Sequence, residues 1–177
     1  FIRIVLVTSE DVAKSVTSEV IKVIQTGEGQ AAAILSAQSQ IGDSPLLIVN
    51  ADDIVAKSLF ESLLYIADEK CNLLVGYKTD NYFPGGYLVL EGKRVAKIHE
   101  KPGAGNEPSS FVRLVCDYFV RGRNLLDNLK LHDHTDADTR YEQTLSSMMQ
   151  NGEQFEMLEY EDTWIPVKYP WHALSAG

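Results

Sequence analysis

The segment at residues 45–53 constrains the fold of this chain more than any other. It reads Pro-Leu-Leu-Ile-Val-Asn-Ala-Asp-Asp, so an apolar run ends in Asn50 and two adjacent carboxylates, Asp52 and Asp53. In an open α/β sheet the ligand crevice lies at the carboxyl ends of the strands, where acids can hold a hard cation and its phosphates. Asn and Asp after a strand are also ordinary turn and helix-capping residues. The segment alone leaves both interpretations open.

Strand-like and helix-like segments alternate along the first half of the chain. Apolar strands are expected at 2–7, 20–24, 46–50 and 73–77. Helices are expected after the capping residues 8–11, and at 30–38 and 58–67. Such alternation indicates a largely parallel sheet that is covered by helices on both faces.

The second half of the chain adds antiparallel strands. A hairpin is expected over residues 86–98, with further strands at 110–120 and 155–160 and helices at 124–131 and 141–151. The tail at 162–171 contains two Trp and two Pro, which is more typical of a site-forming loop than of a core element. We therefore predict an α/β fold of the Rossmann-like, three-layer αβα type. Its sheet is expected to be mixed but mostly parallel, in a single domain over residues 1–177.

Composition and charge argue against several classes of function. No apolar run approaches the roughly 18 residues of a membrane helix, so no membrane partner is expected. The net charge of −9 argues against a nucleic-acid partner, since binding to the phosphate backbone depends on clustered Lys and Arg. A small anionic substrate is compatible with this charge if a divalent cation accompanies it. Cys71 and Cys116 lack disulfide or zinc-binding spacing, which predicts a reducing, cytoplasmic compartment.

One loop has the residue types of a metal site. It contains His132, Asp133, His134, Asp136 and Asp138. Because this loop has no apolar neighbours and lies between two predicted helices, we interpret it as a solvated connection. His99 and His172 are isolated, without a Ser or Cys partner at a suggestive spacing, so no nucleophilic triad is predicted.

Five segments share their order and spacing with a known family. They are Gln25 with the run Gly-Gln-Ala-Ala-Ala-Ile-Leu at 29–35, Leu-Ile-Val-Asn-Ala-Asp at 47–52, Gly-Tyr-Leu-Val-Leu at 86–90, Glu-Lys-Pro at 100–102, and the tail at 164–176. Together they resemble the sugar-phosphate nucleotidyltransferases, notably the glucose-1-phosphate thymidylyl- and uridylyltransferases. These enzymes join a nucleoside triphosphate to a sugar 1-phosphate and release pyrophosphate. The resemblance implies the nucleotide-diphospho-sugar transferase fold.

The resemblance also implies roles for residues on the nucleotide side. Gln25 and Gly29 are expected to hold the base, because an amide can pair with the edge of a pyrimidine and a glycine lets the backbone approach closely. This points to dTTP or UTP, although a plain strand-to-helix turn is the alternative. Asp52 is expected to bind Mg²⁺ that bridges the phosphates during in-line displacement, with Asp53 as a neighbour or cap.

On the sugar side the resemblance implies a second group of residues. Glu100 is expected to bind a sugar hydroxyl and Lys101 the phosphate, which makes Lys101 and Asp52 the catalytic pair. A solvated strand end is the alternative for this triplet. Gly86 is expected to lie against the sugar, and Glu142 matches a sugar-contacting acid. A Glu in the first turn of a helix also suits the helix dipole.

The chain departs from the family pattern at its start and in its tail. The family's Gly-rich loop, with its Arg and following Pro-Lys, is expected before Phe1, so the predicted domain lacks its N-terminal strand and signature loop. Pro166 stands where the family has an Asp that is a second magnesium ligand, and Lys168 stands where it has a Gly. Metal binding is then weakened, or relocated to Asp162 or Asp117.

The strand that contacts the sugar in the family also differs. Leu114, Val115 and Cys116 stand where an Asn and a Gly are usual, so the identity of the sugar is not carried over. Two other functions remain open. One is a non-catalytic or regulatory relative of the same fold, whereas the enzyme is compatible with a homo-oligomer. The other is a nucleotide-sugar glycosyltransferase that uses residues 51–53 as its metal motif.

Overall fold

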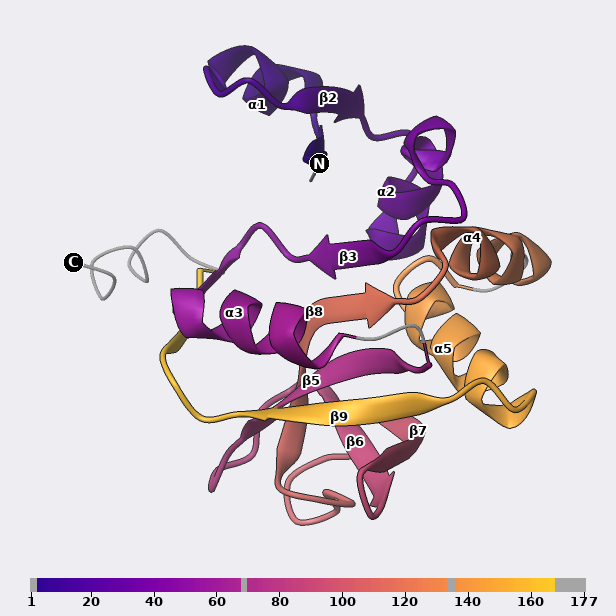
Figure 1. The fold of residues 1–177 in the computed structure, drawn as a ribbon. Helices are drawn as coiled ribbons and strands as arrows, with labels where there is room; N and C mark the ends of the chain where they lie inside the picture. Colours follow the sequence, from indigo (N-terminus) through magenta and orange to yellow (C-terminus); the bar gives the residue numbers. More distant parts are fainter. Residues whose placement is uncertain (1–2, 68–69, 134–135, 168–177) are drawn as a thin grey trace. The chain divides into compact units, whose positions relative to one another are not determined.

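The computed structural model describes residues 3–67, 70–133 and 136–167 (Figure 1). The chain forms two compact units. Unit 1 consists of Phe1–Pro45 and Arg121–Met148, and unit 2 consists of Leu46–Val120 and Met149–Gly177. Each unit therefore draws on two separate stretches of the sequence.

Unit 1 begins with a parallel pair of strands. β1 (Val5–Thr8) and β2 (Ile21–Ile24) pair along their whole length. Parallel neighbours need a crossover connection, and the helix α1 (Glu10–Ser15) lies in it. The Ser9 side chain caps α1 by accepting a hydrogen bond from the Val12 amide at 3.5 Å. The strand, helix and strand predicted for this part of the sequence are confirmed.

The other elements of unit 1 are helical. They are α2 (Gly29–Ser36), the 3₁₀ turn η1 (Gln38–Gln40), α4 (Gly122–Leu131) and α5 (Arg140–Gln150), whose last two residues belong to unit 2. α4 buries Leu125, Leu126 and Leu129, which share one face of the helix through their spacing. Nε and Nη2 of Arg140 donate to the Leu129 carbonyl at 3.2 and 2.7 Å, which fastens the start of α5 to the end of α4.

Unit 2 contains a six-stranded sheet in the order β3-β8-β5-β9-β7-β6. The strands are β3 (Leu46–Val49), β5 (Asn72–Lys78), β6 (Gly86–Glu91), β7 (Arg94–Glu100), β8 (Phe111–Phe119) and β9 (Phe155–Tyr160). β5 and β9 are parallel, whereas the other neighbours are antiparallel. A mixed sheet is confirmed. A mostly parallel one is not, because β8 lies between β3 and β5 and runs against both.

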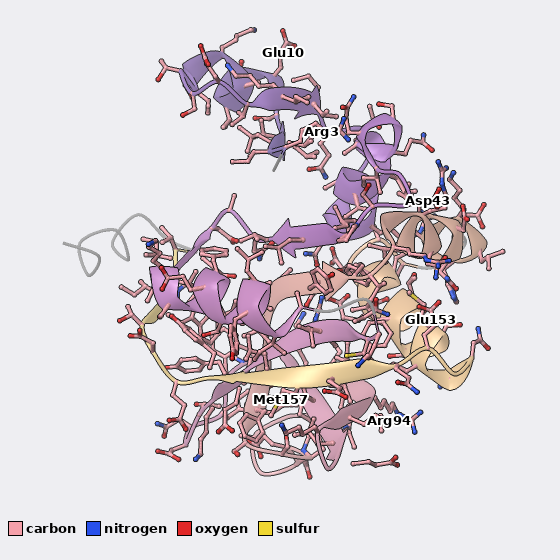
Figure 2. The ribbon with its side chains drawn as sticks, viewed as in Figure 1. Arg3, Glu10, Asp43, Arg94, Glu153 and Met157 are labelled. Carbon is pink, nitrogen blue, oxygen red and sulfur yellow. The ribbon has the colours of Figure 1, made fainter. Side chains whose placement is uncertain are left out.

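The β6–β7 hairpin folds back onto two other strands of this sheet. β6 pairs with β8 at Tyr87 and Val112, and β7 pairs with β9 at Arg94 and Glu156. Because β5 lies between β8 and β9, the strands β8, β5, β9, β7 and β6 form a closed ring. Figure 2 marks Arg94 at the start of β7. The hairpin is therefore held along both of its outer edges.

Gly76 of β5 provides the space that this closure needs. A Cβ atom at Gly76 would lie 2.5 Å from Sδ of Met157 on β9 and 3.2 Å from Cδ1 of Leu88 on β6. Figure 2 labels Met157 on β9. Leu88 itself is fully buried. A side chain at position 76 would therefore have to displace the residues that fill the interior of the ring.

The helix α3 (Lys57–Ile66) covers one face of the strands β5 and β8 (Figure 1). Leu59 and Leu63, one helical turn apart, are buried against alternate residues of the two strands. The strand residues of this core are Leu73 and Val75 of β5 and Leu114, Cys116 and Tyr118 of β8. Complete burial of each leucine contributes roughly 1.5–3 kcal/mol to stability.

A second, two-stranded sheet joins distant parts of unit 2. β4 (Asp53–Val55) is antiparallel to β10 (Trp164–Pro166). The prediction that the tail forms a loop is therefore wrong for these three residues, which pair as a strand. Residues 168–177, including Lys168 and the end of the segment that resembles the family, lie outside the described residues. Among the helices of the described segments, none has the length and apolar character needed to cross a bilayer.

Candidate functional site

The predicted base-binding turn follows β2 in unit 1. The amide of Gln25 donates to the Thr8 carbonyl at 2.9 Å, which continues the β1–β2 pairing by one residue. The side-chain Nε2 of Gln25 donates to the carbonyls of Gly27 and Gly29 at 3.1 and 3.3 Å. The Gln25 amide group therefore spans and holds the turn in this structure. Pairing with a base edge through the same donor would require it to release these carbonyls.

Gly29 occupies a position that admits no side chain. Its φ is +79°, and a Cβ atom would lie 2.3 Å from the carbonyl oxygen of Ala137. A backbone atom cannot give way as the end of a side chain can, so any substitution here displaces the chain around Ala137. The glycine expected from the family pattern thus has a packing reason of its own. Its contact with a base stays a prediction.

A cavity of about 470 Å³ adjoins the turn within unit 1. Its volume is typical of small-molecule pockets. The turn contributes Glu28 to the lining, and α2 contributes Ala32 and Leu35. Asp133 and Arg140, which come much later in the sequence, also line the cavity. The guanidinium of Arg140, which donates to the Leu129 carbonyl, adds one positive charge to the wall beside the two carboxylates. The wall therefore carries charges of both signs.

The two acids that end the β3 segment have different surroundings in unit 2. Asp52 lies exposed in the turn between β3 and β4, and its carbonyl accepts a hydrogen bond from the Val167 amide at 2.7 Å. The neighbouring Asp53 accepts a hydrogen bond at Oδ1 from Nε1 of Trp164 at 2.7 Å. Asp53 is thus part of the link between β4 and β10, whereas the carboxylate of Asp52 lies at the surface.

Asp52 provides one carboxylate ligand, which fits a cation that is also bound by the phosphates of a substrate. Pro166 is paired with Asp53, so the position expected to supply a second carboxylate supplies none. Within residues 3–67, 70–133 and 136–167, no three His, Cys, Asp or Glu side chains gather as a metal cluster. Mg²⁺ is usually held by one or two carboxylates together with substrate phosphates and water. Asp52 can therefore serve as a single protein ligand to Mg²⁺ that a triphosphate carries.

The alternative metal ligands considered from the sequence are engaged in other contacts. The Asp162 carboxylate accepts hydrogen bonds from the Thr163 amide at 2.7 Å and Ser58 Oγ at 2.9 Å, and these bonds lower the pKa of Asp162. Asp117 forms a buried ion pair with Arg113, which lies four residues earlier in the same strand β8. Neither carboxylate belongs to a cluster of acids in the described part of the chain.

The His- and Asp-rich loop is largely exposed in its described part. Asp133, Asp136 and Asp138 are exposed, and the Asp136 carboxylate accepts a hydrogen bond from the Asp138 amide at 2.9 Å. His134 lies outside the described residues. The interpretation as a solvated connection is confirmed for the residues that the structure describes.

Three of the predicted sugar-side residues lie together in unit 2. Gly86 of β6 is paired with Glu100, the last residue of β7. A Cβ atom at Gly86 would lie 2.9 Å from Oε2 of Glu100, so this glycine leaves space for the carboxylate. Lys101 follows directly, and its Nζ lies 3.8 Å from Oε1 of Glu100. The cluster presents one carboxylate and one ammonium at the end of β7.

Lys101 has an unusual backbone conformation. Its φ is +43°, and among the described non-glycine residues it alone has a positive φ. Its amide donates to the Gly85 carbonyl at 3.1 Å, which holds the conformation. The left-handed region costs a residue with a Cβ roughly 1–2 kcal/mol. Backbone strain of this kind concentrates at functional positions, which is consistent with the functional role predicted for Lys101.

Trp164 connects the acids to the sugar-side cluster, and the sequence analysis did not single it out. Its ring lies 5.0 Å from that of Tyr77, edge to face, and 5.0 Å from that of Phe83. The Phe83 carbonyl accepts a hydrogen bond from the amide of Gly85, the residue that holds Lys101. The only feature of the sequence that pointed to Trp164 was its position in the Trp- and Pro-rich tail.

The strand that contacts the sugar in the family is closed to solvent at its centre in this chain. Arg113 and Asp117 are 3% and 0% exposed and pair with each other. Cys116 is also buried. Burial, followed by the negative charges of Asp117 and Asp53, raises the pKa of the Cys116 thiol to about 12. The thiol is therefore neutral at physiological pH, so Cys116 does not supply a nucleophilic thiolate.

The predicted site residues are divided between the two units. Gln25, Gly29 and Glu142 belong to unit 1, and Glu142 lies in the first turn of α5. Asp52 and the cluster of Gly86, Glu100 and Lys101 belong to unit 2. Within unit 2 the structure joins the acids and the cluster through Trp164 and Phe83. The roles of all these residues in binding and catalysis stay predictions.

Solved structures with this fold include several nucleotide-sugar enzymes. One is assigned as a glucose-1-phosphate thymidylyltransferase from Bacillus anthracis, in complex with sucrose: it is 13% identical, with a TM-score of 0.76, over 97% of this chain and 73% of that one. Apo UDP-glucose pyrophosphorylase is 16% identical, with a TM-score of 0.70, over 88% and 61%. UTP-bound UGPase from Acinetobacter baumannii is 15% identical, with a TM-score of 0.68, over 94% and 62%.

These likenesses establish a mixed α/β fold shared with nucleotide-sugar enzymes. The chain spans less than two thirds of the length of the two pyrophosphorylases. Curated protein sequences give no match. The family model described as nucleotidyl transferase matches residues 7–167, which is most of the chain. On this match, the chain belongs to the nucleotidyl transferase family.

Proposed function

We propose that the protein joins a nucleoside triphosphate, dTTP or UTP, to a sugar 1-phosphate and releases pyrophosphate. Membership of the nucleotidyl transferase family supports a reaction of this class. The observation that carries the proposal is the cluster of Gly86, Glu100 and Lys101. It offers an ammonium for a phosphate and a carboxylate for a sugar hydroxyl, and the carboxylate lies in the space left by the missing side chain of Gly86.

The reaction is an in-line displacement. An oxygen of the sugar 1-phosphate attacks the α-phosphorus of the triphosphate, the new P–O bond forms, and the bond to the β-phosphate breaks with release of pyrophosphate. No covalent intermediate on the protein is needed, so the protein contributes position and charge. Lys101 binds and orients the attacking phosphate, and Glu100 accepts a hydrogen bond from the sugar.

The nucleotide side of the proposal rests on the roles that the family resemblance implies. Asp52 would hold the Mg²⁺ that accompanies the triphosphate, and the ion would supply charge neutralisation for the phosphates. Gln25 and Gly29 hold the pyrimidine base, and Glu142 contacts the sugar. A Rossmann-like three-layer arrangement of helices around the mixed sheet is proposed for the fold. A cytoplasmic location agrees with the free thiol of Cys116.

A non-catalytic relative that keeps the ligand-binding residues is the second candidate. The observation that favours it is Pro166, which lies opposite Asp53 in the β4–β10 pair where a second carboxylate is expected. With Asp52 as the single carboxylate ligand, the protein holds the metal less firmly. Such a protein binds a nucleotide or sugar nucleotide without turnover.

Release of pyrophosphate is the measurement that decides between these functions. The full chain is incubated with dTTP or UTP, glucose 1-phosphate and Mg²⁺, and we expect pyrophosphate only when the sugar phosphate is present. Asp52→Asn should abolish this turnover and leave the melting temperature within a few degrees, because Asp52 is exposed. Lys101→Ala should raise the KM for the sugar phosphate far more than the KM for the triphosphate.

The matched control is Lys97→Ala, which removes an exposed lysine from β7, the strand that directly precedes Lys101. It should leave both KM values unchanged. Binding of a sugar nucleotide without release of pyrophosphate would favour the non-catalytic relative. Hydrolysis of a sugar nucleotide in the absence of an acceptor would favour a glycosyltransferase instead.

A further inference from the structure

Asp53 and Trp164 join two strands that are too short to hold each other firmly. β4 and β10 pair over three residues each. The hydrogen bond from Trp164 Nε1 to Asp53 Oδ1, at 2.7 Å, ties the same two strands through their side chains. Next to this pair of strands, the Val167 amide donates a backbone hydrogen bond to the Asp52 carbonyl at 2.7 Å. The backbone of Asp52 is thus fixed by its contact with the end of β10.

The Trp164 ring continues this link toward Lys101. It packs at 5.0 Å against the ring of Phe83. The amide of Phe83 donates to the hydroxyl of the buried Tyr87 at 2.8 Å, and its carbonyl accepts from Gly85 at 2.9 Å. Phe83 therefore fixes the loop that carries the Gly85 carbonyl. Any rotation of the Trp164 ring would be transmitted to this loop.

Lys101 depends on that loop for its conformation. Its φ of +43° is unfavourable for a residue with a side chain. The bond from its amide to the Gly85 carbonyl, at 3.1 Å, is the backbone contact that holds it there. If the loop moves, Lys101 can relax to an ordinary conformation, and its ammonium then takes a new position. A displacement of about 1 Å in a substrate-binding group can cost about 100-fold in rate.

We propose that Asp53 and Trp164 are positioning residues, which set the geometry of both Asp52 and Lys101 through one hydrogen-bonded pair. The proposal rests on the function proposed above for those two residues. The pair touches no reacting atom. It fixes β10 against the acids on one side and, through Phe83 and Gly85, the left-handed Lys101 on the other.

The test compares variants that break or keep the single hydrogen bond. Asp53→Ala removes the acceptor, Trp164→Phe removes the donor but keeps a ring, and Asp53→Asn keeps a carbonyl oxygen that can accept. The first two should raise the KM for the sugar phosphate about tenfold or more, together with the Mg²⁺ concentration needed for half-maximal rate. Asp53→Asn should restore both values to within about twofold of the unsubstituted chain.

Ser58→Ala is the matched control. It removes the Ser58–Asp162 hydrogen bond of 2.9 Å, which lies near the same strands but does not lead to Phe83 or Lys101. It should leave both kinetic values unchanged. A loss of melting temperature in Asp53→Ala without a change in KM would overturn the proposal and leave a structural role. Asp53→Asn behaving like Asp53→Ala would overturn it too.

A second readout does not depend on turnover. In ¹H–¹⁵N spectra, Asp53→Ala and Trp164→Phe should shift the backbone amide of Lys101, whereas Ser58→Ala should not. If the unsubstituted chain releases no pyrophosphate, the proposed function fails, yet these spectra still decide whether the pair governs Lys101. An unshifted Lys101 amide in both variants would overturn the positioning role.

Discussion

At the scale of single residues, Glu153 is a carboxylate whose ionisation opposes folding. It is half-buried just before β9, where Figure 2 labels it, and Nδ2 of Asn72 donates to its Oε2 at 3.4 Å. Burial raises the pKa of Glu153 above its ordinary value of 4.5, and the Asn72 hydrogen bond offsets only part of this. The folded state therefore binds this proton more tightly than the unfolded state.

We expect Glu153→Gln to raise the melting temperature at pH 7. The sign follows from the raised pKa: the charged carboxylate costs stability above that pKa, and the cost disappears as the pH falls through it toward 4.5. The gain should therefore shrink as thermal melts are repeated from pH 7 down to pH 4. Glu159→Gln, at an exposed position of β9, is the control and should show no such trend. A gain that is constant across this range would contradict the assignment.

Residue types at the candidate site could be predicted from the sequence, but their environments could not. Asp52 and Asp53 are adjacent acids in the sequence, and only the pairing of β4 with β10 gives Asp53 to Trp164. The left-handed conformation of Lys101 comes from a bond to Gly85, sixteen positions earlier. Local sequence does not specify such contacts between distant segments.

At the scale of elements, Tyr160 fastens three segments of unit 2 with one hydroxyl. It ends β9, accepts a hydrogen bond from the Ala56 amide at 2.9 Å, and donates to the Thr163 carbonyl at 2.6 Å. Ala56 caps the start of α3, and Thr163 precedes β10. One buried side chain thereby sets where the helix begins and where the last strand turns back.

Tyr160→Phe should destabilise the protein although its ring is kept. The substitution removes two hydrogen bonds in a buried setting, each contributing about 0.5–1.5 kcal/mol. For a chain of this size, each kcal/mol corresponds to roughly 2–4 °C in melting temperature. Calorimetry should therefore show a drop of several degrees. Tyr65→Phe, at a tyrosine that is 91% exposed on α3, should leave the melting temperature unchanged. Equal melting temperatures for both variants would contradict this role.

Most helices and strands could be predicted from apolar periodicity, because each such element buries a continuous face or run. The short strands β4 and β10 could not, since three residues are too few to show a period. The direction of β8 relative to β3 and β5 could not be predicted from the sequence either. It depends on pairing between segments far apart in the chain, which alternation of strands and helices does not encode.

At the scale of the whole molecule, the two units differ in how well their strands are protected. In the strand pair of unit 1, the residues of β1 are partly buried, and those of β2 are mostly exposed. In unit 2, five consecutive residues of β5 are buried, and β5 has a partner on each side. Strands with few buried contacts open at lower free energy than strands at the centre of a sheet.

Hydrogen exchange should therefore separate the two units. We expect the amides of β1 and β2 to exchange through a local opening, and those of Leu73 to Val75 in β5 only through global unfolding. Measuring exchange at increasing denaturant distinguishes these routes, because only the global route depends steeply on denaturant. The same free energy and denaturant dependence for β1 and β5 would show that the chain unfolds as one cooperative unit.

The strand order of unit 2 also bears on how the protein is made. β9 lies between β5 and β7 in space, yet it is the last of the six strands along the chain. Until a ribosome has delivered residues 155–160, the neighbouring edges of β5 and β7 have no strand between them. A nascent chain paused before this point exposes the backbone of a buried, apolar strand, which is a template for association with other chains. Before β9 is in place, the fold therefore has an open strand edge that a chaperone can protect.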